Sequence, residues 1–220
     1  MDFNIDHVLK ELSNERPIFH SEDDFKFSLA WIIKREYPQA KIRLEYTPDF
    51  DRNIHIDIVV ILDGQLIPIE LKYKTKELDL TLGAERYILK EQVSTNDTCY
   101  NFIKDITRIE IFKNKESNFK EGYAIFLANR LLYEKGPTND KLNYINFAIN
   151  DGNTKKGELF YLREGVVVSD DKNYPALSLE GEYIFNWKEY SSIEKYFNIN
   201  IEDSKFKNAK EFKYLAIKIS

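Results

Sequence analysis

Residues 54–72 have the sequence IHIDIVVILDGQLIPIELK, and this stretch decides the fold of the 220-residue chain. β-Branched residues are frequent on both sides of Asp63-Gly64, as is typical of two strands joined by a tight turn. Asp and Gly tolerate the positive φ angles that a two-residue hairpin turn requires. We therefore predict a β-hairpin with strands over residues 54–62 and 65–73.

Three charged side chains lie within this apolar stretch, at Asp57, Glu70 and Lys72. In a two-residue hairpin Asp57 is expected to face Glu70, and side-chain alternation puts Lys72 on the same face. Facing carboxylates repel unless a cation lies between them or one is protonated. Two hard oxygen ligands on rigid strands suit Mg²⁺ or Mn²⁺. The alternative is an ordinary ion pair between Glu70 and Lys72 on an edge strand.

Asp57 followed on the next strand by Glu70-Leu71-Lys72 resembles the signature of the PD-(D/E)XK nuclease superfamily, also called restriction-endonuclease-like. That signature is an Asp beginning one strand of a hairpin and a (D/E)-x-K on the other. Ile56 stands where the motif has Pro, a variation that the superfamily often shows. The resemblance covers about the first half of the chain. It implies an α/β restriction-endonuclease-like core, with a mixed central sheet flanked by helices.

Residues 21–38 are predicted to form a helix that begins at the N-cap Ser21 and ends at Pro38. Glu22 shares the face of the apolar stripe, so its carboxylate should point inward. Many nucleases of the superfamily resemble this, with an acidic residue on the first helix near the metal. The alternative is that Glu22 only complements the helix dipole. The stripe consists of Phe25, Leu29, Ile32 and Ile33.

The resemblance also implies the composition of an active site. Asp57, Glu70 and the backbone carbonyl of Leu71 would hold Mg²⁺, with Mn²⁺ expected to substitute, and Glu22 would complete the site. Lys72 would position or help deprotonate the attacking water, or stabilise charge that develops on the phosphate. The number of metal ions, one or two, is left open.

Three further residues are candidates for substrate contact. His55 is predicted beside Lys72, and Gln92 follows the hairpin where the superfamily often carries a polar residue. Lys74 continues past the motif and could approach phosphates, as could Lys76 and Arg130. The alternatives are a histidine that is exposed or at the edge of the core, and cations that are simply solvated.

The remaining segments are expected to complete one domain over residues 1–220, with a core of about 18–130 and a C-terminal elaboration over 131–220. A helix over residues 97–115 provides the crossover that a strand parallel to the hairpin needs. Within it, Asp105 and Arg108 are expected to form a surface pair at i, i+3. Residues 78–96 are ambiguous, a strand or a loop with a turn at Gly83. Strands are predicted over 41–46, 122–129, 182–190 and 211–219, the last joining the main sheet.

The composition limits the possible functions. The formal net charge is −5 and the sequence pI is about 5.4, whereas non-specific nucleic-acid binders are usually basic. This favours a narrow substrate or a partner protein, and a homodimer is a further alternative. The single Cys99 excludes an intrachain disulfide. The sequence begins without a signal peptide and has no apolar run of membrane-spanning length, so we expect a cytoplasmic protein.

The sequence thus predicts a Mg²⁺-dependent nuclease that hydrolyses DNA, with RNA not excluded, in restriction, repair or defence. One alternative is a catalytically silent binding or regulatory subunit of the same fold. A second alternative is a small-molecule phosphohydrolase, which would need a closed pocket.

Overall fold

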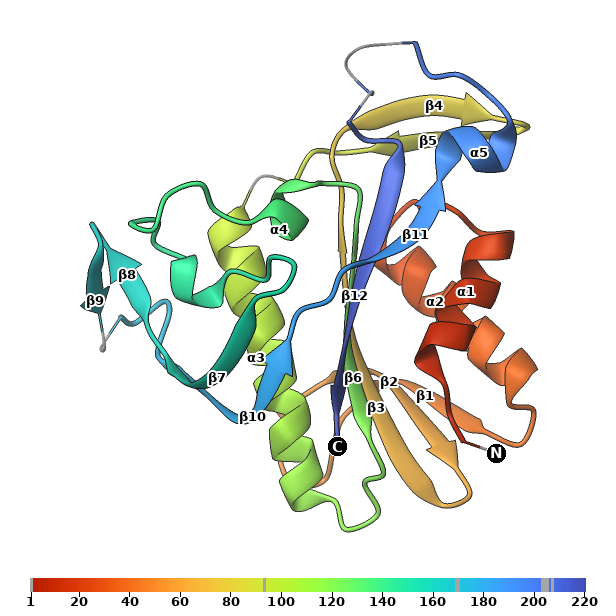
Figure 1. Ribbon diagram of the computed structural model, residues 1–220. Helices are drawn as coiled ribbons and strands as arrows, with labels where there is room; N and C mark the ends of the chain where they lie inside the picture. The colour runs from red at the N-terminus through yellow and green to blue at the C-terminus, as the bar shows by residue number, and fades with distance from the viewer. Residues whose placement is uncertain (1, 93, 169–170, 203–205, 207) are drawn as a thin grey trace.

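The computed structural model describes residues 2–92, 94–168, 171–202, 206 and 208–220. Within these residues a mixed six-stranded sheet has the order β1-β2-β3-β6-β12-β11. Helices α1 (Ile5–Glu15) and α2 (Glu22–Glu36) lie on one side of it, and α3 (Thr95–Lys115) lies on the other (Figure 1). The strands are β1 (Lys41–Tyr46), β2 (Ile56–Leu62), β3 (Gln65–Lys74), β6 (Gly122–Ala128), β11 (Lys188–Ser192) and β12 (Glu211–Ile219).

The predicted hairpin is confirmed as β2 and β3. Its two turn residues, Asp63 and Gly64, have φ angles of 53° and 79°, the left-handed conformation of a tight hairpin turn. The antiparallel register runs from Leu62↔Gln65 to Ile58↔Ile69, as expected from a two-residue turn.

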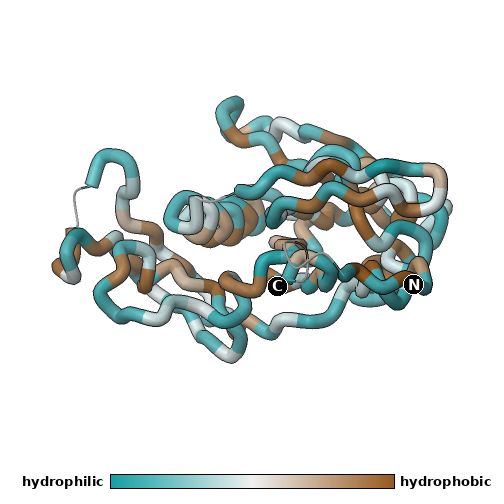
Figure 2. The backbone as a smooth tube through the Cα atoms, turned by 90° about the horizontal axis from the view of Figure 1, so that it is seen from above, coloured by the Kyte–Doolittle hydropathy of each residue, from teal (hydrophilic) through white to brown (hydrophobic). Residues whose placement is uncertain are grey.

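The crossover through α3 is also confirmed, because β6 pairs in parallel with β3 on the side opposite to β2. Because side chains alternate along β6, this strand contributes core residues to both faces of the sheet. Ile125 and Leu127 pack with α1 and α2, whereas Ala124 and Phe126 pack with α3. In Figure 2 hydrophobic residues line the strands and the helix surfaces beside them, and hydrophilic residues occupy most of the outer turns.

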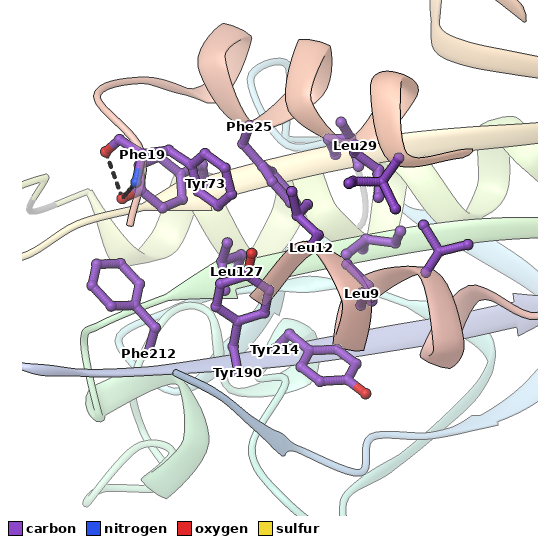
Figure 3. Close-up of a cluster of buried hydrophobic side chains, with 14 of the residues drawn as sticks. Leu9, Leu12, Phe19, Phe25, Leu29, Tyr73, Leu127, Tyr190, Phe212 and Tyr214 are labelled. Atoms are coloured by element: carbon purple, nitrogen blue, oxygen red, sulfur yellow. Dashed lines mark hydrogen bonds between the residues drawn. The ribbon is translucent and has the colours of Figure 1, made fainter. Parts of the chain in front are cut away.

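Helix α2 follows its sequence signals closely. The Ser21 side chain accepts a hydrogen bond from the Asp24 amide at 3.1 Å, which caps the helix, and the predicted apolar stripe is buried. The helix ends at Glu36, two residues before Pro38. Its buried side chains, including Phe25 and Leu29, pack against the sheet in the cluster drawn in Figure 3.

Helix α1 is an element that the sequence analysis missed. Asn4 caps it by accepting a hydrogen bond from the His7 amide at 3.0 Å. Val8, Leu9 and Leu12 are buried at helical spacing, and Leu9 and Leu12 lie in the same apolar cluster as α2 (Figure 3).

The ambiguous segment after the hairpin is a second hairpin. Strands β4 (Leu78–Leu82) and β5 (Glu85–Leu89) pair antiparallel, and Gly83 in their turn has φ 62°. Beyond β6 the smaller elements are α4 (Leu132–Lys135), the 3-10 helix Ile145–Phe147, β7 (Thr154–Leu159), β8 (Tyr161–Arg163), β9 (Val166–Val168), β10 (Leu177–Ile184) and α5 (Ile193–Phe197). Within the described ranges, every helix is too short or too polar to cross a lipid bilayer.

The predicted single strand over residues 182–190 is wrong, whereas the predicted strand at the C-terminus is confirmed. The former segment divides between β10, which pairs with β7, and β11, which pairs with β12 of the main sheet. Between them the Phe185 amide donates to Asn153 at 2.8 Å, and the Trp187 amide donates to Asp151 at 2.9 Å. These hydrogen bonds hold the backbone where it passes from the β7–β10 sheet to the main sheet. Strand β12 joins the main sheet, as predicted, by pairing antiparallel with β6.

Lys155 on β7 provides a test of packing outside the main sheet. Its ammonium group donates to the Ile145 carbonyl at 3.2 Å, and burial lowers its pKa to about 8. Below that pH the folded state must hold a buried charge, and between pH 8 and 10.5 the unfolded chain binds more protons. Hence Lys155→Met should be more stable than the wild type at pH 7, and the difference should shrink as the pH rises toward 10.5. Urea denaturation of both proteins across this range measures it; a constant difference would contradict the assignment.

Candidate functional site

The candidate site begins where the β2–β3 ladder ends. Beyond the pair Ile58↔Ile69, carboxylate side chains accept hydrogen bonds from the backbone amides of β3 in place of the β2 backbone. Asp57 Oδ2 accepts the Leu71 amide at 2.8 Å, and Glu22 Oε2 accepts the Tyr73 amide at 2.7 Å. Two carboxylates, one from β2 and one from α2, therefore converge on the part of β3 that carries the (D/E)-x-K motif.

This arrangement differs from the predicted one in two respects. The ladder does not continue to a pair of Asp57 with Glu70, because the Asp57 carboxylate itself takes the Leu71 amide. His55 lies before β2 and is exposed, with Nδ1 2.9 Å from Thr47 Oγ1. The prediction that His55 lies opposite Lys72 in a continuous ladder is wrong for the same reason.

Glu70 and Lys72 lie on the face of β3 that α3 covers. Glu70 is 2% exposed, and its Oε1 lies 2.6 Å from Arg108 Nη1. Lys72 Nζ lies 2.6 Å from Asp105 Oδ2, and Arg108 Nη1 lies 3.2 Å from Asp105 Oδ1. The four side chains form a chain of alternating charges that we call the β3–α3 charge network: Glu70, Arg108, Asp105 and Lys72.

The expectation that Asp105 and Arg108 form a surface pair is therefore wrong. Asp105 is only 3% exposed. It lies at i+3 from Phe102 and at i−4 from Ile109, and both of these residues are fully buried on the apolar stripe of α3. That spacing is the sequence signal that could have placed it inside. A pair at i, i+3 can bridge to charges on another element as well as to each other.

Burial and pairing act in opposite directions on the protonation of this network. Burial raises the pKa of Glu70 well above its ordinary value, and the Asp105 charge adds to the effect, while Arg108 opposes it. Burial lowers the pKa of Lys72, but the adjacent Asp105 carboxylate outweighs it and raises the pKa overall. Lys72 is thus held as an ammonium ion. Burial likewise raises the pKa of Asp105, against the effect of Lys72 and Arg108.

Lys26 on α2 is a further charged residue that the sequence analysis missed. It is 8% exposed, and its Nζ lies 3.7 Å from Asp57 Oδ1 and 3.0 Å from Asp23 Oδ1. It also donates to Glu45. Lys26 follows Glu22 by one helical turn, and this i, i+4 spacing was the available signal. Its ammonium group supplies positive charge on the α2 side of Asp57.

The remaining predicted residues lie near the end of β3. Lys74 Nζ is 3.7 Å from Glu22 Oε2, which brings Lys74 to the same carboxylate that binds the Tyr73 amide. Gln92 Oε1 accepts the Thr75 amide at 3.2 Å, and the Gln92 amide donates to the Thr75 carbonyl at 3.0 Å. The Gln92 amide oxygen is thus bonded to the backbone that follows β3.

The donor set suits a hard divalent cation in its chemistry. Asp57, Glu70 and Glu22 offer carboxylate oxygens, and the Leu71 carbonyl lies between them in the sequence. As folded, each carboxylate is engaged by an amide or a cation of the protein. In the part of the chain that the structure describes, three or more His, Cys, Asp or Glu side chains nowhere form a group that could hold a metal ion. Arg108 occupies Oε1 of Glu70, so its positive charge competes with a metal ion for this carboxylate.

The charge network predicts a strong coupling between Glu70 and Arg108. Arg108→Met leaves Glu70 buried without its partner, so the free energy of unfolding should fall by about 3 kcal/mol. The double variant Glu70→Gln/Arg108→Met removes both charges and should recover part of this loss. Urea denaturation of the wild type, both single variants and the double variant gives the coupling energy. Additive effects of the two substitutions would show that the contact is not important for stability.

Comparison with known proteins adds no assignment to this geometry: no protein-family model and no curated protein matches the chain.

Proposed function

We propose that the chain is a divalent-metal-dependent nuclease with a restriction-endonuclease-like core, which hydrolyses phosphodiester bonds in DNA. The proposal depends mainly on one observation: the Asp57 and Glu22 carboxylates converge on Leu71 and Tyr73 of β3, beside the buried charges of Glu70 and Lys72. The element order supports it, because α2, the antiparallel strands β1, β2 and β3, the crossover α3 and the parallel strand β6 follow the order that the resemblance implies.

In this proposal Asp57, Glu70 and the Leu71 carbonyl would hold Mg²⁺, and Glu22 would complete the site. When bound, the ion would lower the pKa of a coordinated water and neutralise negative charge on the phosphate. Lys72, held as an ammonium ion by Asp105, stabilises charge that develops on the phosphate oxygens. This assigns Lys72 an electrostatic role and not that of a general base. Asp105 and Arg108 act through Lys72 and Glu70, so they are positioning residues.

The substrate and setting belong to the same proposal. DNA is the substrate we favour, and RNA is the alternative to test beside it. The net charge of −5 agrees better with a narrow substrate, a homodimer or a partner protein than with tight binding to any nucleic acid. Action in the cytoplasm, in restriction, repair or defence, is an analogy to the superfamily.

One observation favours a second candidate function, a catalytically silent subunit of the same fold. Arg108 Nη1 is 2.6 Å from Glu70 Oε1, so a protein cation already neutralises the carboxylate that a metal ion would need. In a silent subunit this pairing would be permanent. In a nuclease it would be exchanged when the metal ion binds.

Removal of single carboxylates tests catalysis. Asp57→Asn and Glu70→Gln should each lower Mg²⁺-dependent cleavage by about 100-fold or more, because each removes a charge that the proposed site needs. Cleavage is measured on supercoiled, linear and single-stranded DNA and on RNA, with Mg²⁺, Mn²⁺ or EDTA. Asp63→Asn is the matched control, because it removes a carboxylate from the turn of the same hairpin and Asn tolerates the positive φ there. Cleavage at the wild-type rate by the two site variants would refute the assignment.

Arg108 distinguishes the two candidate functions. Because Arg108→Met removes the competing cation from Glu70, it should raise the affinity for Mn²⁺ about 10-fold or more in a calorimetric titration. The nuclease proposal also requires that the wild type itself binds Mn²⁺ and that Glu70→Gln weakens this binding. A wild type that binds no Mn²⁺ and cleaves nothing would favour the silent subunit.

A further inference from the structure

The carboxyl ends of β3 and β6 form a second polar site above the candidate active site. A cavity of about 400 Å³ lies there, lined by three cations, Lys76, Arg130 and Lys135, together with Glu91 and Asn208. Lys76 follows β3, Arg130 follows β6, and Lys135 ends α4, so residues distant in sequence meet at one edge of the sheet (Figure 1). Ligands of α/β proteins commonly bind at this edge, outside the carboxyl ends of parallel strands.

The backbone that carries these cations is held firmly. The Lys76 amide donates to Asn129 Oδ1 at 2.7 Å. Asn129 is 1% exposed, and its Nδ2 donates to the Ala209 carbonyl at 2.8 Å. Arg130 Nη1 donates to the Gln92 carbonyl at 2.6 Å, which fixes the guanidinium while its other N–H groups stay available as donors. Hydrogen bonds within the protein therefore hold the backbone at Lys76 and the guanidinium of Arg130 in place.

Its charge contrasts with that of the chain and of the candidate site. The chain as a whole carries −5, but this cavity has three cations against one carboxylate. Lys26, Lys72 and Lys74 at the candidate site all lie within 4.0 Å of a carboxylate. Across the described residues, we find no such ion pair for Lys76, Arg130 or Lys135. The cavity therefore presents uncompensated positive charge.

A line of lysines connects the two sites. Lys72 and Lys74 lie two residues apart on β3 and so share one face of the strand, and Lys76 follows two residues after the strand ends. Both bonds between Gln92 and Thr75 hold the backbone between Lys74 and Lys76. Four residues span at most roughly 13 Å at about 3.3 Å each, which is the upper bound on the backbone distance from Lys72 to Lys76.

We propose that this cavity binds a backbone phosphate of a nucleic-acid strand, on the same strand as the phosphate placed at Lys72. The inference rests on the proposed function, because that function places a second phosphate of the same strand at Lys72. Binding of a phosphate at the cavity does not itself require cleavage. Arg130 offers planar guanidinium donors that match phosphate oxygens, and Lys76 and Lys135 act as point charges. Free phosphate or a nucleoside monophosphate shares this chemistry, so the experiment must separate these ligands from a nucleic-acid strand.

The test is binding without cleavage. Fluorescence anisotropy with labelled single-stranded and double-stranded oligonucleotides in EDTA compares the wild type with the double variant Lys76→Gln/Lys135→Gln over a range of NaCl concentrations. We expect about 10-fold weaker binding at low salt and a slope of log K against log salt that is smaller by about 1 to 2, as for one or two lost phosphate contacts. Lys41→Gln/Lys156→Gln changes the net charge equally on exposed strands elsewhere and should bind like the wild type. Thermal melting checks that all variants are folded.

The outcomes separate this inference from the nuclease proposal. Equal affinities and equal salt slopes for the wild type and Lys76→Gln/Lys135→Gln would overturn the inference that the cavity binds a phosphate. A wild type that binds neither oligonucleotide would overturn it as well. If the double variant loses affinity for inorganic phosphate alone and binds oligonucleotides normally, the nucleic-acid assignment is overturned in favour of a small phosphate ligand. If it loses oligonucleotide affinity while the wild type fails to cleave with Mg²⁺, the cavity assignment stands and the nuclease proposal fails.

Discussion

The pairing of buried charges between β3 and α3 is the constraint on which the candidate site depends. Glu70, Asp105, Lys72 and Arg108 alternate in sign within hydrogen-bonding distances. An unpaired charge at this depth would cost several kcal/mol of folding free energy. Helix α3 therefore packs on the sheet with the face that carries Asp105 and Arg108 toward β3. The rotation of α3 therefore determines which atoms surround Glu70 and Lys72. Replacement of buried ion pairs by well-packed apolar residues is often neutral or stabilising in proteins, so the presence of such pairs is weak evidence that they serve stability.

Besides Glu70 on β3, a second glutamate is buried on α3, and its contacts are those of a carboxylate with a structural role. Glu110 is 3% exposed and accepts hydrogen bonds from the Glu180 and Gly181 amides and the Tyr183 hydroxyl, at 2.7–3.1 Å. These neutral donors belong to the backbone of β10 and to a buried tyrosine ring. Glu70 instead relies on a single arginine side chain that keeps 27% of its surface exposed. A side chain with access to solvent can move away, so the charge on Glu70 can be balanced by another cation.

Local signals predicted most of the core, and long-range pairing set the rest. The Asp63-Gly64 turn was sufficient to predict the register of β2 with β3, and Ser21 and the apolar stripe were sufficient for α2. The Asp105–Arg108 pair was misplaced because spacing along one helix says nothing about a partner on a distant strand. The same limit explains why the prediction for Asp57 failed in detail: nothing local shows that its side chain, and not its backbone, binds β3.

The distribution of compensated charge offers a way to reconcile an acidic chain with the nucleic-acid substrate that we propose. At the candidate site each cation already has a carboxylate partner, so that site adds little net attraction for a polyanion. Attraction would come from the uncompensated cations at the carboxyl ends of β3 and β6, because Coulomb forces act over about one Debye length, roughly 8 Å at physiological ionic strength. A strand held there and extended along β3 would bring its next phosphates toward Lys74 and Lys72. Binding and chemistry would then be carried by different residues on one strand, and the overall charge of −5 would favour substrates that reach this edge over indiscriminate contact with the rest of the surface.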